Sequence, residues 1–395
     1  MQTSNSTVSF ENTEIAFKAK SDGALKQSYW LFKLIGYNWL VKVGPPLVNA
    51  AFAMHLPIIG IIRKTVFKQF CGGESMDDCN QTIDDLYSYK VGTILDYSVE
   101  GEQVEANFDA TMQETLHTIR KAKSNKKIPF TVFKVTGVAR FDLLAKVNAK
   151  QVLTAAEESE FGRVRNRIHT ICKEAHANNV RIFIDAEESW IQDAIDDMAR
   201  EMMLEFNRTS CIVYNTLQMY RHDRLAYLHT CYQDAVAHNY LLGLKLVRGA
   251  YMEKERKRAD DMGYMSPIQP NKEATDKDYD EALKFCMLHL DKISICAGSH
   301  NEESSLLLTR LMQEKGLAHD DERIFFSQLF GMSDHISFNL SSAGYNVAKY
   351  LPYGPVKSVM PYLFRRAAEN TSVKGQSGRE LTLITKEVKR RKTNR

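Results

Sequence analysis

Eight short runs rich in β-branched and aromatic residues recur between residues 91 and 350, and segments with the apolar spacing of helices separate them. This regular alternation predicts a parallel β/α fold, and eight is the number of strands that closes a (β/α)8 barrel. We expect the strands at residues 91–95, 130–135, 180–185, 211–217, 241–247, 293–297, 324–327 and 345–350.

The length of 395 residues suits one large domain with an appendage, or two domains. We divide the chain into a helical region at residues 1–88, the barrel at 89–375 and a basic tail at 376–395. A doubly wound open sheet is the alternative to the barrel. No Gly-x-Gly-x-x-Gly motif follows the first predicted strand, which counts against the dinucleotide-binding form of that sheet.

Two helices between the strands have marked starts. Ser189, with Gln192 three residues later, predicts a capping box in front of a helix at 190–202. Asn301 predicts the N-cap of a second helix, which runs to residue 314.

The first 88 residues differ from the barrel region. Residues 27–42 predict one aromatic-rich helix, and residues 43–62 then run for twenty residues without a formal charge. Pro45, Pro46, Asn49, His55 and Pro57 interrupt this run, so we do not expect a membrane-spanning helix. Two interpretations stay open: short helices that cover the barrel, or a surface that dips into a bilayer. The basic tail at 386–395 is expected to be solvated, with contact to anionic lipid as the alternative.

Composition and charge argue against several classes of ligand and of targeting signal. A formal net charge of +3 is too small to predict nucleic acid binding. The seven cysteines form no Cys-x-x-Cys pair and no metal-like Cys/His cluster, so we expect free thiols in a reducing compartment and no metal site. Glu11 and Glu14 stand near the start of the sequence without an apolar run, which argues against a secretory signal or a transit peptide.

In a barrel, chemistry lies where strands end and loops begin. Lys134 is the hardest polar residue to explain structurally, because a buried ammonium flanked by apolar residues needs an anionic partner. Asp185 could instead orient a loop, and Asn301 could serve only as a helix cap. Together, the polar residues near the strand ends predict a functional rim: Lys134, Asp185, Gln218, Lys245, Arg248, His300, Asn301, Gln328 and Tyr350.

An adjacent pair of arginines, Arg365 and Arg366, follows the apolar run at 359–364 and precedes Glu369 on one predicted helix. Each planar guanidinium can bond a carboxylate through two hydrogen bonds, so the pair is suited to clamp a small anion. A solvated basic patch is the alternative. The apolar run favours the clamp, because the arginines interrupt apolar sequence and do not extend a polar surface.

Several short motifs then occur in the order in which the proline dehydrogenase family has them. The chain resembles this family over residues 90–375. The most specific motif joins Tyr350-x-Pro-x-Gly to Tyr-Leu-Phe-Arg-Arg-x-x-Glu-Asn at 362–370, and the others lie at 133–136, 184–188, 218–220, 245–251, 299–301 and 328–332. The resemblance implies a distorted (β/α)8 barrel that holds FAD at the carboxyl ends of its strands.

The resemblance also implies which residues meet the substrate. Lys134, Arg365 and Arg366 would hold the proline carboxylate, and three cations around one carboxylate fit the charge argument above. Lys245 and Tyr350 are expected to be the catalytic residues. The full substrate set implied by the resemblance is Lys134, Asp185, Leu246, Tyr251, Leu329, Tyr350, Arg365 and Arg366.

A second set corresponds to the family's flavin contacts. Many bacterial members carry arginine beside flavin N5 where this chain has Lys245, whose charge can still stabilise a reduced flavin. The sequence near Gln328 is one residue tighter than the family pattern, so Ser327 could take its place. The implied cofactor set is Asp185, Gln218, Lys245, Val247, Arg248, Gly249, Ala250, Thr275, His300, Asn301, Gln328, Leu329, Glu369 and Ser372.

The activity implied is the first step of proline breakdown to glutamate. Proline would lose a hydride from the ring carbon beside its nitrogen to flavin N5, which gives Δ1-pyrroline-5-carboxylate. No room for an aldehyde dehydrogenase follows residue 375, so we expect a monofunctional form that passes electrons to a membrane quinone. The expected location is the bacterial cytoplasm, peripheral at the inner membrane, with the mitochondrial matrix or inner membrane as the alternative.

Two rival functions remain at this point. The first is oxidation of trans-4-hydroxy-L-proline on the same scaffold. The resemblance implies that the phenol of Tyr350 crowds the fourth ring carbon, which favours proline. The second is a non-catalytic barrel that binds amino acids or a lipid surface.

No side chain stands out as a general base, so the amine of the substrate is expected to bind already deprotonated.

Overall fold

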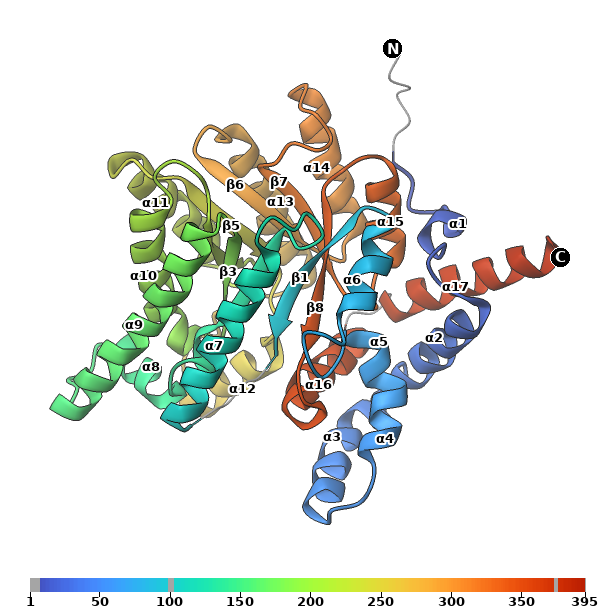
Figure 1. The fold of residues 1–395 in the computed structure, drawn as a ribbon, viewed down its shortest axis with the longest axis horizontal. Helices are drawn as coiled ribbons and strands as arrows, with labels where there is room; N and C mark the ends of the chain where they lie inside the picture. The colour runs from blue at the N-terminus through green and yellow to red at the C-terminus, as the bar shows by residue number, and fades with distance from the viewer. Residues whose placement is uncertain (1–7, 99–102, 373–375, 395) are drawn as a thin grey trace.

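The computed structural model describes residues 8–98, 103–372 and 376–394, and within its helices it leaves aside the side chains at 38, 40–42, 369–372, 376 and 377. Eight parallel strands close into a barrel in the order in which they occur along the chain (Figure 1). The open sheet is excluded, because the first strand pairs with the eighth from Val91↔Val347 to Tyr97↔Tyr353. The strands are β1 (Val91–Tyr97), β2 (Phe130–Lys134), β3 (Arg181–Asp185), β4 (Val213–Gln218), β5 (Leu242–Val247), β6 (Ile293–Gly298), β7 (Ile324–Leu329) and β8 (Val347–Tyr353).

Helices follow the strands and form the outer ring. Short turns join the two layers, and the 3-10 turn η2 (Val135–Gly137) follows β2 directly. These helices are α7 (Glu105–Ala122), α8 (Phe141–Asn148), α9 (Ala155–Ala177), α10 (Ser189–Phe206), α11 (Arg224–Ala237), α12 (Met252–Met262), α13 (Lys272–Leu288), α14 (Glu302–Glu314) and α15 (Asp334–Ser342). The helix after β8, α16 (Val356–Ser372), lies instead across the carboxyl end of the barrel (Figure 1).

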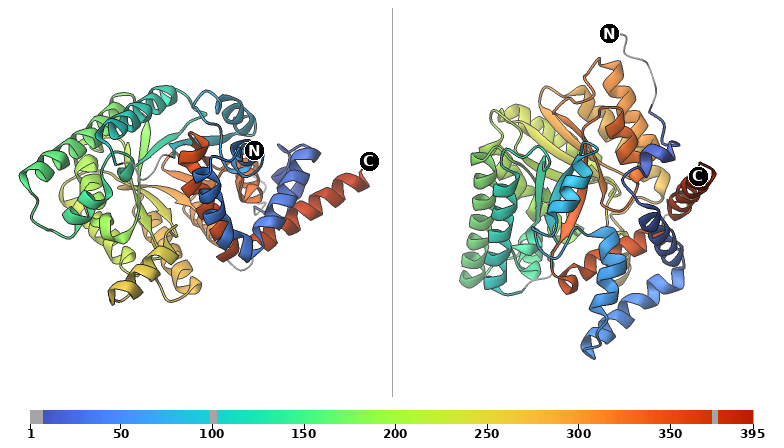
Figure 2. Two further views of the ribbon diagram at one scale, coloured as in Figure 1. Left: turned by 90° about the horizontal axis from the view of Figure 1, so that it is seen from below. Right: turned by 45° about the vertical axis from the view of Figure 1, so that its right-hand side comes forward.

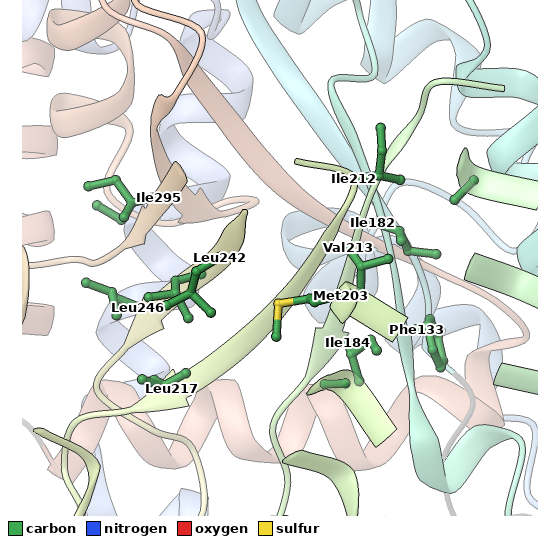
Figure 3. Close-up of a cluster of buried hydrophobic side chains, with 14 of the residues drawn as sticks. Phe133, Ile182, Ile184, Met203, Ile212, Val213, Leu217, Leu242, Leu246 and Ile295 are labelled. Carbon is green, nitrogen blue, oxygen red and sulfur yellow. The ribbon is translucent and has the colours of Figure 1, made fainter. Parts of the chain in front are cut away.

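Alternation along each strand divides the core into two clusters. On β3, Phe183 belongs to the cluster inside the barrel, whereas Ile182 and Ile184 belong to the larger cluster between strands and helices. Figure 3 shows part of the outer cluster, including Leu242 and Leu246 of β5. A residue's parity on its strand therefore decides whether it can reach the interior of the barrel.

The two predicted helix starts have different outcomes. Asn301 caps α14, because its side chain accepts a hydrogen bond from Ser304 N at 3.1 Å, so that prediction is confirmed. The capping box at Ser189 is wrong. Ser189 is the first residue of α10, and its N–H and hydroxyl both donate to the carboxylate of Glu255 at 2.6 Å. A buried carboxylate from α12 has thus taken the place of a local cap.

The N-terminal region consists of short helices: α1 (Thr13–Ala16), α2 (Asp22–Ile35), α3 (Asn38–Ala53), α4 (Ile59–Ile62), the π-helical turn η1 (Arg63–Phe67), α5 (Lys68–Phe70) and α6 (Asn80–Tyr87). The single helix predicted at 27–42 is wrong, because the chain breaks at Gly36 and Tyr37. Pro45 and Pro46 do not break α3. Proline has no backbone N–H, so the carbonyl group four residues before each proline lacks its usual donor. Much of α3 is exposed, so these carbonyl groups can accept hydrogen bonds from water. Of the helices in the described residues, none is long and apolar enough to cross a bilayer.

The C-terminal tail is not the frayed segment that its composition predicts. It forms α17 (Gln376–Thr393), in which Leu383 and Ile384 are fully buried. Arg391 donates to the carbonyl oxygens of Phe17 and Lys20, both at 2.9 Å, so α17 lies beside α2 (Figure 2). Residues of the N-terminal helices, α16 and α17 form one further core cluster. The division of the chain into regions at residues 88 and 375 stays a prediction. The regions before and after the barrel share this core cluster.

Candidate active site

A layer of aromatic rings closes the barrel interior below its carboxyl end. The rings of Phe130 and Phe183 stack at 4.4 Å between centroids, and Tyr214 and Phe325 meet Phe130 edge-on at 5.4 and 4.9 Å. Stacked and edge-on aromatic contacts of this kind are favourable and fill the space without polar atoms. Charged side chains at the next level therefore have no access to water from below.

Four sequence-predicted residues come together directly above this layer. Lys134 ends β2, Asp185 ends β3, and Lys245 and Tyr350 point inward from β5 and β8. Asp185 is bonded by the ammonium of Lys245 and accepts a hydrogen bond from the hydroxyl of Tyr350 at 2.8 Å. Lys134 Nζ lies 3.2 Å from the same hydroxyl and 3.8 Å from Asp185 Oδ2. Asp185, Lys245 and Tyr350 are buried, and the side chain of Lys134 is 9% exposed.

The surroundings fix the charge state of this group. Burial works to raise the pKa of Asp185, but the charges of Lys245 and Lys134 and the two hydrogen bonds to it lower that pKa below its ordinary value. Burial and the neighbouring Asp185 hold the pKa of Tyr350 well above its ordinary value. Asp185 is therefore a carboxylate and Tyr350 a neutral phenol that donates its proton to it.

The helix with the arginine pair lies across the carboxyl ends of the strands (Figure 1). The guanidinium of Arg365 stands 5.4 Å from the ring of Tyr251, and that of Arg366 stands 4.9 Å from the ring of Tyr362. Arg366 is buried and Arg365 partly so. The structure thus brings Tyr251 to Arg365, and neither arginine lies on a fully exposed surface. The side chains of Glu369 and Ser372 lie outside the described residues.

Polar residues of the predicted cofactor set gather at the ends of β4 to β6. Arg248 is held on three sides, by Asp276 at 2.7 Å and by the hydroxyls of Ser299 and Ser304 at 2.7 and 2.9 Å. His300 bonds Ser333 at 2.8 Å. Burial, followed by the charges of Lys349 and Arg366, lowers the pKa of His300 to about 3, so its ring is neutral.

The loop after β5 depends on a glycine. Gly249 has φ +134°, and a Cβ atom there would lie 2.5 Å from the ring of Tyr220. Only glycine combines this backbone conformation with so close a neighbour. Ala250 follows Gly249, and the partly buried Val247 lies two residues before it. Thr275 lies buried near the start of α13, where its hydroxyl donates to Asn271 O at 3.3 Å. Gln218 ends β4 and donates to Glu187 O at 2.6 Å.

Two residues of the predicted sets, Leu246 and Gln328, face away from the barrel interior. Leu246 follows the inward-facing Lys245, so its side chain points into the outer cluster and not toward the substrate group. Gln328 also faces outward, donating to Ser299 O at 3.1 Å and accepting from Ser337 at 2.7 Å. Asn301 is used as a helix cap. Ser327 lies on the inward face, beside Cys296, and Leu329 packs against the interior cluster near Tyr350.

One buried acid at this level was missed by the sequence analysis. Asp96 lies near the end of β1 with 0% of its surface exposed, and its two carboxylate oxygens are 3.4 and 3.5 Å from Lys134 Nζ. The prediction ended the first strand at residue 95, so Asp96 was not counted among the strand-end residues. An acid that closes an apolar run, as Asp185 does on β3, was the available signal. Among the described residues, no group of three or more His, Cys, Asp or Glu side chains could hold a metal ion.

Comparisons with known proteins agree with this geometry. The family model for proline dehydrogenase matches residues 79–379. The chain is 33% identical over 377 residues to proline dehydrogenase 1, mitochondrial, of Arabidopsis thaliana, which covers 85% of this chain and 76% of that protein. It is 35% identical over 322 residues to the carbapenem antibiotics biosynthesis protein CarD of Pectobacterium carotovorum subsp. carotovorum, with 82% and 83% covered. It is 30% identical over 417 residues to hydroxyproline dehydrogenase of Xenopus laevis, with 96% and 89% covered.

A solved structure gives the same barrel. Proline utilization A from Bdellovibrio bacteriovorus, inactivated by N-propargylglycine, superposes with a TM-score of 0.71 at 18% identity. The match covers 96% of this chain and 42% of that one, and at this identity it shows the fold alone. The family model and the curated relatives extend the likeness from fold to activity. The chain belongs to the proline dehydrogenase family, whose members are oxidoreductases that act on proline.

Proposed function

We propose that this protein oxidises L-proline to Δ1-pyrroline-5-carboxylate with FAD as its cofactor. The observation that carries the proposal is the buried group of Lys134, Asp185, Lys245 and Tyr350 beneath the helix that bears Arg365 and Arg366. Cations that lie above a layer of aromatic rings and away from water are suited to bind a small carboxylate, because charge-assisted hydrogen bonds are strongest where water is absent. The imine product then opens in water to glutamate semialdehyde.

The residues present fit FAD in part. Gly249 allows the loop after β5 to pack closely against the ring of Tyr220, and Arg248 in the same loop provides a positive charge that would favour a pyrophosphate. The neutral ring of His300 can share a hydrogen bond without adding charge. Gln328 does not fit, because its side chain points away from the barrel interior and bonds Ser299 and Ser337 there. When bound, FAD would accept the hydride that leaves the proline ring.

The protein side of the reaction is mainly positioning. Lys134, Arg365 and Arg366 hold the substrate carboxylate, and Tyr350 stays protonated and is fixed by its hydrogen bond to Asp185. Lys245 keeps positive charge at the site while Asp185 holds its ammonium in place. Asp185 is a weak base because its pKa is lowered, so the proposal assigns no general base and the amine binds deprotonated.

The test is anaerobic reduction of the flavin by each of two substrates. We expect the purified protein to be yellow and its oxidised flavin absorbance to bleach with L-proline, much faster than with trans-4-hydroxy-L-proline. A preference for the hydroxylated substrate would move the assignment to hydroxyproline oxidation, an activity named for the Xenopus laevis relative. Flavin that neither substrate reduces, or protein without flavin, would refute the proposal.

A membrane quinone is the acceptor that we propose for the electrons. α2, α3 and α4 carry large apolar side chains that face water, and one face of the same helices packs on α16 through Val48 and Phe52. Trp and Leu side chains in such positions insert at the boundary between lipid headgroups and chains, without spanning the bilayer. A respiratory membrane, bacterial or mitochondrial, would supply the quinone. The most exposed apolar residues of this N-terminal region are Trp30 58%, Trp39 63%, Leu47 62%, Met54 65% and Ile61 66%.

Vesicle binding tests this surface. We expect the double variant Trp39→Ser, Leu47→Ser to lower binding to vesicles that contain anionic lipid by tenfold or more, because each buried apolar side chain contributes about 1.5–3 kcal/mol. Val152→Ser is the matched control, since Val152 is 97% exposed on the loop before α9. Equal binding by the double variant, the control and the unchanged protein would contradict the proposal.

A further inference from the structure

Asp96 is a buried acid that no part of the proposed reaction uses. Asp96 on β1 pairs in register with Val132 on β2, and Lys134 follows Val132 by two residues on the same, inward face. The ammonium of Lys134 faces both oxygens of Asp96 almost equally, at 3.4 and 3.5 Å. The hydroxyl of Ser98 donates to Asp96 Oδ2. The carboxylate is therefore fixed from one side and presented to Lys134 on the other.

The other described carboxylate near Lys134 is engaged elsewhere. Asp185 Oδ2 lies 3.8 Å from Lys134 Nζ, farther than either oxygen of Asp96. Asp185 is bonded by Lys245 and by the hydroxyl of Tyr350. Among the described residues, Asp96 is thus the nearest anion to the Lys134 ammonium.

We propose that Asp96 is a positioning residue that keeps Lys134 protonated and aimed at the substrate carboxylate. The proposal rests on the proposed function, in which Lys134 is part of the clamp. A lysine side chain is a point charge on a flexible stem, so its ammonium stays in one place only if a fixed partner holds it. Asp96, on a barrel strand and fully buried, is such a partner.

The charges around Lys134 show why the loss of one acid matters. Asp96 on β1 and Asp185 on β3 favour the ammonium, whereas Lys245 on β5, which shares Asp185 with it, disfavours it. Arg365 and Arg366 add positive charge on α16, the helix across the carboxyl end of the barrel. Tyr350 on β8 is neutral and contacts Lys134 through its hydroxyl. Without Asp96, Asp185 is the one carboxylate that Lys134 and Lys245 share among the side chains that the structure describes. Burial also opposes the charged form, so the ammonium would lose its proton at a lower pH. A neutral amine cannot clamp a carboxylate through charge.

The experiment compares affinity with pH in Asp96→Asn, Asp96→Glu and the unchanged holoenzyme. The probes are KM for L-proline and the Kd of tetrahydrofuran-2-carboxylate, read from the flavin absorbance. This compound carries the carboxylate but has an ether oxygen in place of the amine. We expect Asp96→Asn to raise both constants about tenfold or more at pH 8.5, as for a lost charge-assisted contact. Both should recover toward the unchanged values near pH 6, while kcat changes less than KM.

Asp96→Glu keeps the negative charge and should show no new dependence on pH between these limits. Asp234→Asn is the matched control for neutralising an ion-paired acid, because Asp234 pairs with Arg200 on the outer helices at 2.7 Å. Its constants should match those of the unchanged protein.

Constants for Asp96→Asn within twofold of the unchanged protein at every pH would overturn the proposal. A rise by the same factor at every pH would also overturn it, because packing damage does not depend on the protonation of Lys134. Failure of the proposed function looks different, since the unchanged protein would then not be reduced by L-proline at all.

Discussion

Arg365→Met should weaken the apparent affinity for L-proline about a hundredfold or more, because loss of one partner of a buried charge pair typically costs about 2–5 kcal/mol. Arg365 lies on α16, the helix that crosses the mouth of the barrel (Figure 1), and its guanidinium stands beside the ring of Tyr251. Methionine removes the charge and the planar guanidinium but preserves the apolar contact with that ring. Stopped-flow bleaching of the flavin over a range of L-proline concentrations measures the effect.

Two further variants define what Arg365 contributes. Arg365→Lys retains the charge but lacks the planar guanidinium, so its apparent affinity for L-proline should lie between that of Arg365→Met and that of the unchanged protein. Arg163→Met removes an arginine that is half exposed and pairs with Glu105 at 2.6 Å on the outer surface, so it should leave the affinity unchanged. An affinity of Arg365→Met within threefold of the unchanged protein would show that the arginine pair does not hold the substrate.

Asp185→Asn should lower the free energy of unfolding at pH 7 by about 3–5 kcal/mol, the usual effect of removing one partner of a buried ion pair. Asn has nearly the same shape, so Tyr350 can still donate to its side-chain oxygen. Lys245 and Lys134 would lose the carboxylate that they share. Urea denaturation at pH 7 measures the loss.

The same variant predicts a dependence on pH. The pKa of Asp185 is lowered in the folded protein, so its contribution is fully present above the unfolded value of about 3.9 and is lost as pH falls through the folded value. The difference in unfolding free energy between the unchanged protein and Asp185→Asn should therefore shrink below about pH 4. Asp234→Asn, which neutralises a carboxylate in a partly exposed pair, should cost about 1 kcal/mol or less. A pH-independent difference for Asp185→Asn would contradict the assigned ionisation.

The barrel was predictable because periodicity and strand count are local properties of the sequence. Strand ends were less secure. The last strand was expected at residues 345–350, but β8 runs from Val347 to Tyr353. Pro352 has no N–H to donate, and its carbonyl oxygen accepts a hydrogen bond from Gly72 N at 2.8 Å. At β1, which ends at Tyr97 and not at residue 95, the same uncertainty about the strand end hid Asp96. The sequence could identify polar residues at the rim, but only parity on the strands shows that Leu246 and Gln328 face outward.

Contacts between distant segments could not be read from the sequence. α17 has the composition of a solvated tail, but Glu387 is completely buried and its carboxylate is bonded by Arg390 and Arg391 of the same helix, at 2.8 and 2.7 Å. These charges neutralise one another within two turns, so the helix can bury Leu383 and Ile384. Nothing in the local pattern specifies that α2 and α16 are the partners.

The core shared by the two ends of the chain has a consequence for how the protein can be shortened. Val359, Met360 and Leu363 of α16 lie in one cluster with Phe32 of α2 and Leu383 of α17. The arginine pair follows these residues on α16, so the apolar support of the clamp comes from both ends of the sequence at once. A minimal barrel cut at residues 89 and 375 would keep every strand and every clamp residue but remove what seats the helix. Such a truncated form should bind the substrate poorly even when its barrel is intact.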